Sequence, residues 1–88
     1  MRREPDFFGE ETELALVYIA KKLKESLALE DVFNQAGLDY LVEPDTYSGG
    51  MIFKSERVGA FFYVAPGGEA GVREVLIQAG YRPYEAGG

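Results

Sequence analysis

Few side chains in this chain could do chemistry, because its 88 residues include neither His nor Cys. The chain therefore lacks the usual general base, the commonest metal ligand and every thiolate nucleophile. Glu43, Asp45 and Glu56 could gather around a hard cation such as Mg²⁺ or Ca²⁺. Three acids that flank a loop prove little in a chain with 15 acidic residues. We predict no metal site, no cofactor and no catalytic residue.

The segment 45–56 is the best candidate for a binding site. Polar residues and glycines open it, and Met51, Ile52 and Phe53 follow them. Long loops in compact domains are usually functional or mobile. We expect an exposed loop that contacts a ligand or another protein, with a binding set at its start: Asp45, Thr46, Tyr47, Ser48, Gly49 and Gly50.

Two glycine-rich segments give weaker indications of a chemical function. Residues 66–71 read PGGEAG, and free backbone N–H groups in such a turn can bind phosphate, but no Lys-Ser/Thr of a nucleotide loop follows. The final Gly87 and Gly88 match the end of ubiquitin-like sulfur carriers, which instead open with a β-hairpin. We predict an ordinary turn over 66–71 and a flexible end over 86–88.

Periodicity places six regular elements between these segments. Apolar residues at i, i+3, i+4 and i+7 predict two helices, which end at Gly37 and Gly80. Pro44 is expected to close the second strand, and Pro83 to confine the last strand to a sheet edge. The predicted strands are 14–20, 38–44, 57–65 and 81–85, and the predicted helices are 23–36 and 69–79.

The two halves of the chain repeat, since VFNQAG at 32–37 aligns with VLIQAG at 75–80. Two βαβ units in tandem predict a single α+β domain over 14–85, a ferredoxin-like βαββαβ sandwich with a four-stranded antiparallel sheet and two helices on one face. Residues 1–13 are charged and are expected to form a flexible tail. Within it, Phe7 and Phe8 either tuck against the domain or dock on another chain.

The strand 57–65 is apolar on both sides, while the helices can cover only one. The opposite face of the sheet, called here the open face, would expose more apolar surface than a soluble monomer tolerates. We therefore expect a homo-oligomer, a dimer or trimer, that packs through this face. The predicted contact residues are Leu16, Tyr18, Leu41, Phe61, Tyr63, Arg82 and Tyr84.

The charge balance argues against two kinds of partner. A net charge of -6 and a pI near 4.5 oppose binding to nucleic acid and to anionic membranes. The apolar runs are too short to span a membrane, and the N-terminus is too charged for a signal peptide. We expect a cytoplasmic protein.

Two alternatives to a non-catalytic binding module stay open. The sequence at 57–64 matches the RNA recognition motif consensus at Arg57, Ala60 and Phe61, which would make the open face a platform for single-stranded RNA. A dimer-interface enzyme of the small ferredoxin-like monooxygenase type is the other, and its available groups are Tyr18, Tyr63, Arg82, Glu43 and Asp45.

The element order, the Gln-Ala-Gly helix end and the LDYLVE strand at 38–43 resemble small bacterial proteins described as signal-transducing domains. That group is distantly related in fold to the nitrogen-regulatory PII proteins. The resemblance spans 14–84 and implies a regulatory module. In PII proteins a loop after the second strand reaches partners and carries a modifiable Tyr, a position that Tyr47 resembles. The PII nucleotide-binding Gly-Lys motif is missing, so ATP and 2-oxoglutarate binding is not implied.

Overall fold

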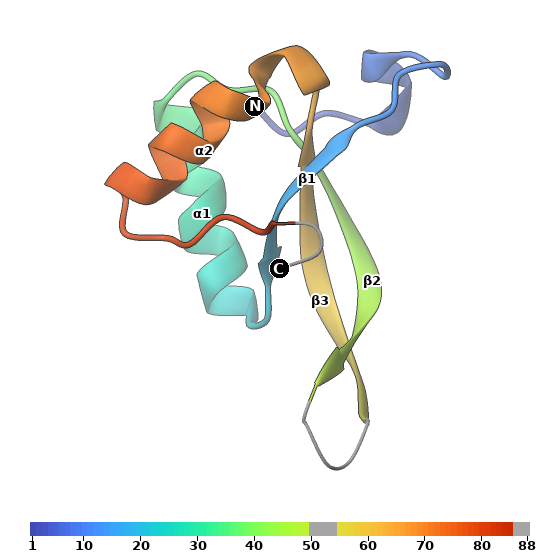
Figure 1. Ribbon diagram of the computed structural model, residues 1–88, viewed down its shortest axis with the longest axis vertical. Coiled ribbons are helices and arrows are strands. Elements are labelled where there is room, and N and C mark those ends of the chain that lie inside the picture. Colours follow the sequence, from blue (N-terminus) through green and yellow to red (C-terminus); the bar gives the residue numbers. More distant parts are fainter. Residues whose placement is uncertain (50–54, 86–88) are drawn as a thin grey trace.

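Two helices pack on one face of an antiparallel sheet (Figure 1). The computed structural model describes residues 1–49 and 55–85. The helices are α1 (Leu23–Gln35) and α2 (Glu69–Gln78), and the strands are β1 (Ala15–Ala20), β2 (Leu41–Gly49) and β3 (Ser55–Val64). The strand order is β1-β3-β2, with β3 in the middle. Two short 3-10 turns, η1 (Pro5–Phe8) and η2 (Pro66–Gly68), precede β1 and α2.

The predicted α+β class is confirmed, but the described residues form three strands and not four. The expected last strand, 81–85, lies beside β1 without forming a ladder. Its Tyr84 N–H donates to the Val17 carbonyl oxygen at 2.7 Å, and Arg73 Nη1 donates to the Tyr84 carbonyl at 2.5 Å. Pro83 has no N–H to donate, so it cannot contribute a ladder hydrogen bond at its position.

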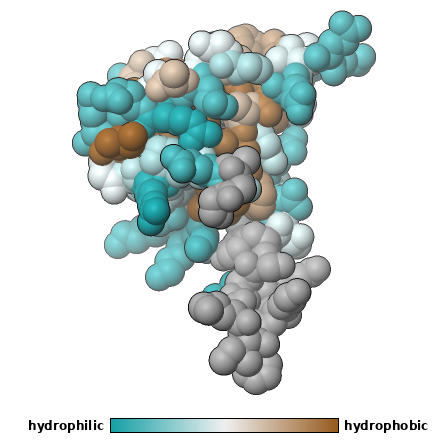
Figure 2. All heavy atoms as spheres, in the orientation of Figure 1, coloured by the Kyte–Doolittle hydropathy of each residue, from teal (hydrophilic) through white to brown (hydrophobic). Residues whose placement is uncertain are grey.

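The core lies between the helices and the sheet and is built around three aromatic rings. Phe33, Tyr40 and Phe62 are fully buried. Phe33 meets the other two edge-on at 5.1 and 5.6 Å, and Tyr40 stacks on Phe62 at 5.9 Å. Hydrophilic residues cover most of the outer surface of the helices (Figure 2). The predicted amphipathic helices therefore turn their apolar sides to the sheet.

A β-bulge in β1 changes which side chains reach the open face. Leu16 pairs with Tyr63 and Tyr18 pairs with Phe62, so Val17 is the extra residue. After this shift Tyr18 is on the helix side, where its ring meets Tyr81 edge-on at 5.6 Å. Placing Tyr18 on the open face was wrong.

Ile19 takes the place on the open face that the sequence predicts for Tyr18, because Ile19 pairs with Phe61. Alternation along β3 puts Phe61 and Tyr63 on the open face and Phe62 on the helix side. The open face of β1 thus carries Leu16 and Ile19.

The predicted loop over 45–56 is largely a β-hairpin. β2 continues through Pro44, which pairs with Ala60, and runs on to Gly49. Pro44 does not end the strand because β2 is an edge strand, where a missing N–H is tolerated. Of the predicted binding set, Asp45, Thr46, Tyr47, Ser48 and Gly49 belong to β2, and Gly50 lies outside the described residues.

The hairpin formed by β2 and β3 extends past the helices (Figure 1). Val58 points to the side of the sheet on which the helices lie, yet it is 68% exposed and faces Leu23 and Ser26 of α1 across an open pocket. The far part of the hairpin is therefore a two-stranded arm, which has little core of its own.

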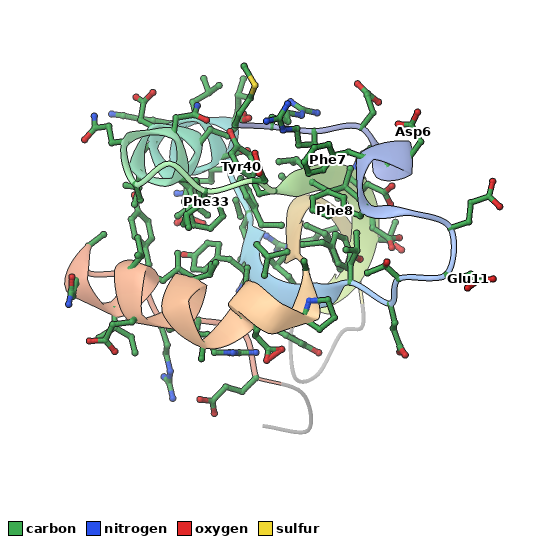
Figure 3. All side chains as sticks on the ribbon, turned by 90° about the horizontal axis from the view of Figure 1, so that it is seen from above. Asp6, Phe7, Phe8, Glu11, Phe33 and Tyr40 are labelled. Carbon is green, nitrogen blue, oxygen red and sulfur yellow. The ribbon has the colours of Figure 1, made fainter. Side chains whose placement is uncertain are left out.

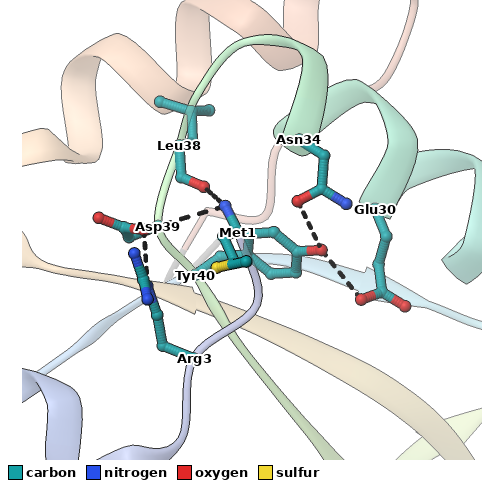
Figure 4. A network of polar contacts seen from close by, with 7 residues as sticks. All are labelled: Met1, Arg3, Glu30, Asn34, Leu38, Asp39 and Tyr40. Atoms are coloured by element: carbon teal, nitrogen blue, oxygen red, sulfur yellow. Dashed lines mark hydrogen bonds and ion pairs between the residues drawn. The ribbon is translucent and has the colours of Figure 1, made fainter.

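The first residues of the chain, which the sequence predicts to be a tail, pair with the residue before β2. Arg3 N–H donates to the Tyr40 carbonyl at 2.7 Å, and Arg2 forms a parallel bridge with Tyr40. Figure 4 shows Arg3 Nε bound to Asp39 Oδ1 at 2.9 Å, with the Met1 amino group bound to the Leu38 carbonyl. We call this set of contacts the N-terminal clamp.

The Tyr40 side chain ties the same point to α1. Its hydroxyl donates to Glu30 Oε1 at 2.9 Å, with Asn34 Oδ1 at 3.4 Å (Figure 4). Arg2 lies 3.8 Å from the same Glu30 oxygen. Burial, followed by the hydrogen bond to Glu30, raises the pKa of Tyr40 to about 12. The phenol is therefore held in its neutral, donating form.

We expect Tyr40→Phe to lower the free energy of unfolding by about 1 kcal/mol, since it removes one partly buried hydrogen bond. Folding favours the neutral phenol, so the contribution of Tyr40 is complete below pH 10 and is lost as the pH rises to about 12. Urea unfolding at both ends of this range measures the effect. Wild type should lose more stability than the variant, and an equal loss in both would contradict the account.

Candidate functional site

The N-terminal segment crosses one end of the open face. Figure 3 shows η1 on the opposite side of the sheet from the helices, with Asp6 and Glu11 directed away from the body. The Phe7 and Phe8 rings meet edge-on at 5.1 Å, and the Arg3 guanidinium lies 4.5 Å from the Phe7 ring centre. Phe8 is half-buried and Phe7 is 52% exposed. These ring contacts lie within the N-terminal segment, and the two predicted roles, packing on the domain and docking on another chain, stay predictions.

A groove of about 520 Å³ lies between this segment and strands β2 and β3. Its apolar lining comes from Leu14, Leu41 and Tyr63, and it is joined by two acidic residues of the N-terminal segment, Asp6 and Glu10, and by Glu43 of β2. We call it the acidic groove, and its lining residues are Pro5, Asp6, Gly9, Glu10, Thr12, Leu14, Leu41, Glu43 and Tyr63.

All charged residues in the lining of the acidic groove are negative. It contains Asp6, Glu10 and Glu43 but neither Lys nor Arg. Within residues 1–49 and 55–85, none of the three carboxylates takes part in an ion pair. Burial, then the charges of Asp45 and Glu43, raise the pKa of Tyr63 above its ordinary value. The groove thus combines an apolar floor, a neutral phenol and a negative potential.

A second groove, of about 560 Å³, lies on the other side of the open face, beside β1. Its positive charges are Lys21 and Arg82, and Tyr84 beside Arg82 is 39% exposed. We call it the Arg82 groove, and its lining residues are Leu16, Tyr18, Ile19, Lys21, Thr46, Phe61, Arg82 and Tyr84.

The predicted self-association residues are divided between the two grooves. Leu41 and Tyr63 line the acidic groove, and the other five line the Arg82 groove. Leu41 and Phe61 are only 6% and 8% exposed, so the apolar surface is smaller than the sequence suggests. Sequence reasoning missed the contributions of Asp6, Glu10 and Leu14. The one available signal was the Phe7-Phe8 pair in an otherwise charged segment.

In the described part of the chain, the side chains that a metal site or an enzyme would need do not lie together. No group of three or more Asp or Glu there could hold a metal ion. Tyr18 lies on the helix side and Tyr63 on the open face, so the two tyrosines of the enzyme hypothesis do not share one surface.

The helices in this part of the chain are too short or too polar to cross a membrane.

Comparisons with family models, with curated proteins and with solved structures found no match for this chain. The resemblance to signal-transducing domains therefore stays a prediction.

We expect Glu43→Gln to lower the pKa of Tyr63, because it removes one of the two charges that disfavour the phenolate. The control is Asp31→Asn, which removes an exposed carboxylate on α1. Titration of the tyrosine ring carbons by NMR follows each phenol separately. An unchanged pKa of Tyr63 in Glu43→Gln, or the same decrease in both variants, would show that Glu43 does not act on the groove.

Proposed function

We propose that this protein is a non-catalytic binding module that holds a basic, partly apolar protein segment in its acidic groove. The observation that carries the proposal is the groove itself, whose lining joins the acidic residues Asp6, Glu10 and Glu43 to an apolar floor and includes neither Lys nor Arg. Its volume falls within the range of about 300 to 1,000 Å³ that is usual for ligand sites. The non-catalytic part rests on a sequence without His or Cys.

The chemistry of the lining favours Lys or Arg as the recognised side chains. Both have an apolar stem that can lie on the half-buried Leu14 and Tyr63, and a charged head that can reach the carboxylates. An Arg head could pair with two oxygens of one carboxylate such as Glu43. Apolar neighbours in the bound segment would add contact with Tyr63.

The charge of the whole chain supports the same class of partner. A net charge of -6 attracts a basic segment over long range and raises its rate of association. Because the groove is open to solvent, salt should weaken this attraction. A regulatory role, which the family resemblance implies, would follow if binding of such a segment changes what the partner does.

The single-stranded RNA alternative has less support. RNA bases that approach Tyr63 would bring their phosphate groups close to Asp6, Glu10 and Glu43, whose negative charges repel phosphate. Phe61 is 8% exposed, so a base could not stack on its ring without displacing the residues that cover it. A protein segment needs neither a basic rim nor a free aromatic face.

The proposal predicts that a labelled peptide of alternating Lys and Leu binds this protein, whereas one of alternating Glu and Leu does not. The double variant Glu10→Gln/Glu43→Gln should weaken binding of the basic peptide at least about tenfold, which corresponds to about 1.4 kcal/mol. Fluorescence anisotropy gives the dissociation constants, and circular dichroism checks that the variant folds.

The matched control is Asp31→Asn/Glu74→Gln, which makes the same change in net charge on the helices. Its effect should stay below about twofold, because exposed charges far from the ligand are screened. Equal weakening by the two double variants would mean that the net charge binds the peptide and not the groove. Absence of binding to wild type would also overturn the proposal.

A further inference from the structure

The segment after α2 has the chemistry that the acidic groove would bind. Arg82 is exposed, and within residues 1–49 and 55–85 it takes part in no ion pair. Pro83 and Tyr84 follow it, so a cationic head stands next to apolar surface. The segment 82–84 is therefore a short basic and apolar stretch on the surface of the molecule.

This segment cannot fill the groove of its own chain. The hydrogen bond from Tyr84 N–H to the Val17 carbonyl fixes it beside β1. The acidic groove lies over β2 and β3 and includes Leu41 and Glu43 of β2. The strand order β1-β3-β2 places β1 and β2 at opposite edges of the sheet. An occupant with the sequence of 82–84 must come from another molecule.

Both grooves are built on side chains of the open face, which allows a reciprocal arrangement. Phe61 and Leu16 belong to the Arg82 groove, and Leu41 and Tyr63 belong to the acidic groove. A two-fold axis that lies between two facing sheets, parallel to their strands, turns the open faces toward each other and exchanges the sheet edges, so it would place the Arg82 side of one copy over the acidic side of the other. Each such contact would then be made twice.

We propose that the protein forms a two-fold dimer in which Arg82, Pro83 and Tyr84 of each copy dock in the acidic groove of the other. This inference rests on the proposed function, since the second copy supplies the basic segment. Arg82 pairs with carboxylates that take part in no ion pair within residues 1–49 and 55–85, and Tyr84 covers the apolar floor beside Leu14 and Tyr63. A dimer and an external basic segment then compete for the same groove.

Sedimentation velocity over a series of concentrations tests the dimer, starting from the 9.7 kDa monomer. We expect wild type to dimerise and Arg82→Glu to raise the dimer dissociation constant at least about tenfold. The control is Lys24→Glu, which makes the same charge change at an exposed position of α1 and should leave dimerisation unchanged. Circular dichroism checks the fold of both variants.

A charge exchange identifies the docking partners. Glu43→Arg alone should weaken the dimer as Arg82→Glu does, whereas a mixture of Arg82→Glu with Glu43→Arg should form a heterodimer, because each introduced charge meets its opposite in the other chain. A wild type that stays monomeric overturns this inference. A dimer that is insensitive to Arg82→Glu, or a mixture that stays monomeric, also overturns it.

These outcomes can be separated from failure of the proposed function. Binding of the alternating Lys and Leu peptide reports the affinity of the groove without a second copy. The peptide should bind more tightly to Arg82→Glu than to wild type, because the competing segment no longer occupies the groove. If the peptide binds but no dimer forms, the proposed binding function stands, and only the proposal that a second copy occupies the groove is rejected.

Discussion

The pairing of the first residues with Tyr40 is the contact on which the candidate site depends. The Arg3 N–H bonds the Tyr40 carbonyl, and Arg3 also binds Asp39. The Tyr40 ring is fully buried against Phe33 and Phe62, and its hydroxyl binds Glu30 of α1. One residue thus joins the core, the sheet edge and the N-terminal segment. Without this clamp the N-terminal segment would not be held across the open face, where it forms a wall of the acidic groove.

Much of the fold follows from local patterns in the sequence. The two helices begin where predicted, because apolar residues at helical spacing are easily recognised and Gly37 and Gly80 follow their ends. The predicted strands fail at two prolines. Pro44 was expected to end a strand that in fact continues along the sheet edge, and Pro83 was expected in a strand that does not form. Proline limits which hydrogen bonds a strand can make, but only tertiary position decides the outcome.

The candidate site could be predicted only in part. Leu41 and Tyr63 were placed on the open face by simple alternation, and both line the acidic groove. The bulge at Val17, which turns Tyr18 to the helix side, leaves no mark in a single sequence. Asp6 and Glu10 come from a segment whose composition is typical of a tail. Their position depends on the clamp at Tyr40, a long-range contact that composition cannot reveal.

Amide hydrogen exchange at Arg3 tests the central claim most directly, because its N–H donates to the Tyr40 carbonyl at 2.7 Å. An account in which the N-terminal segment is a fixed wall of the groove predicts exchange that is slowed at least about tenfold relative to an unstructured peptide, since exchange then requires local opening. Exchange of the Arg3 amide at the rate of an unstructured peptide would contradict it, and the acidic groove would lose one of its walls.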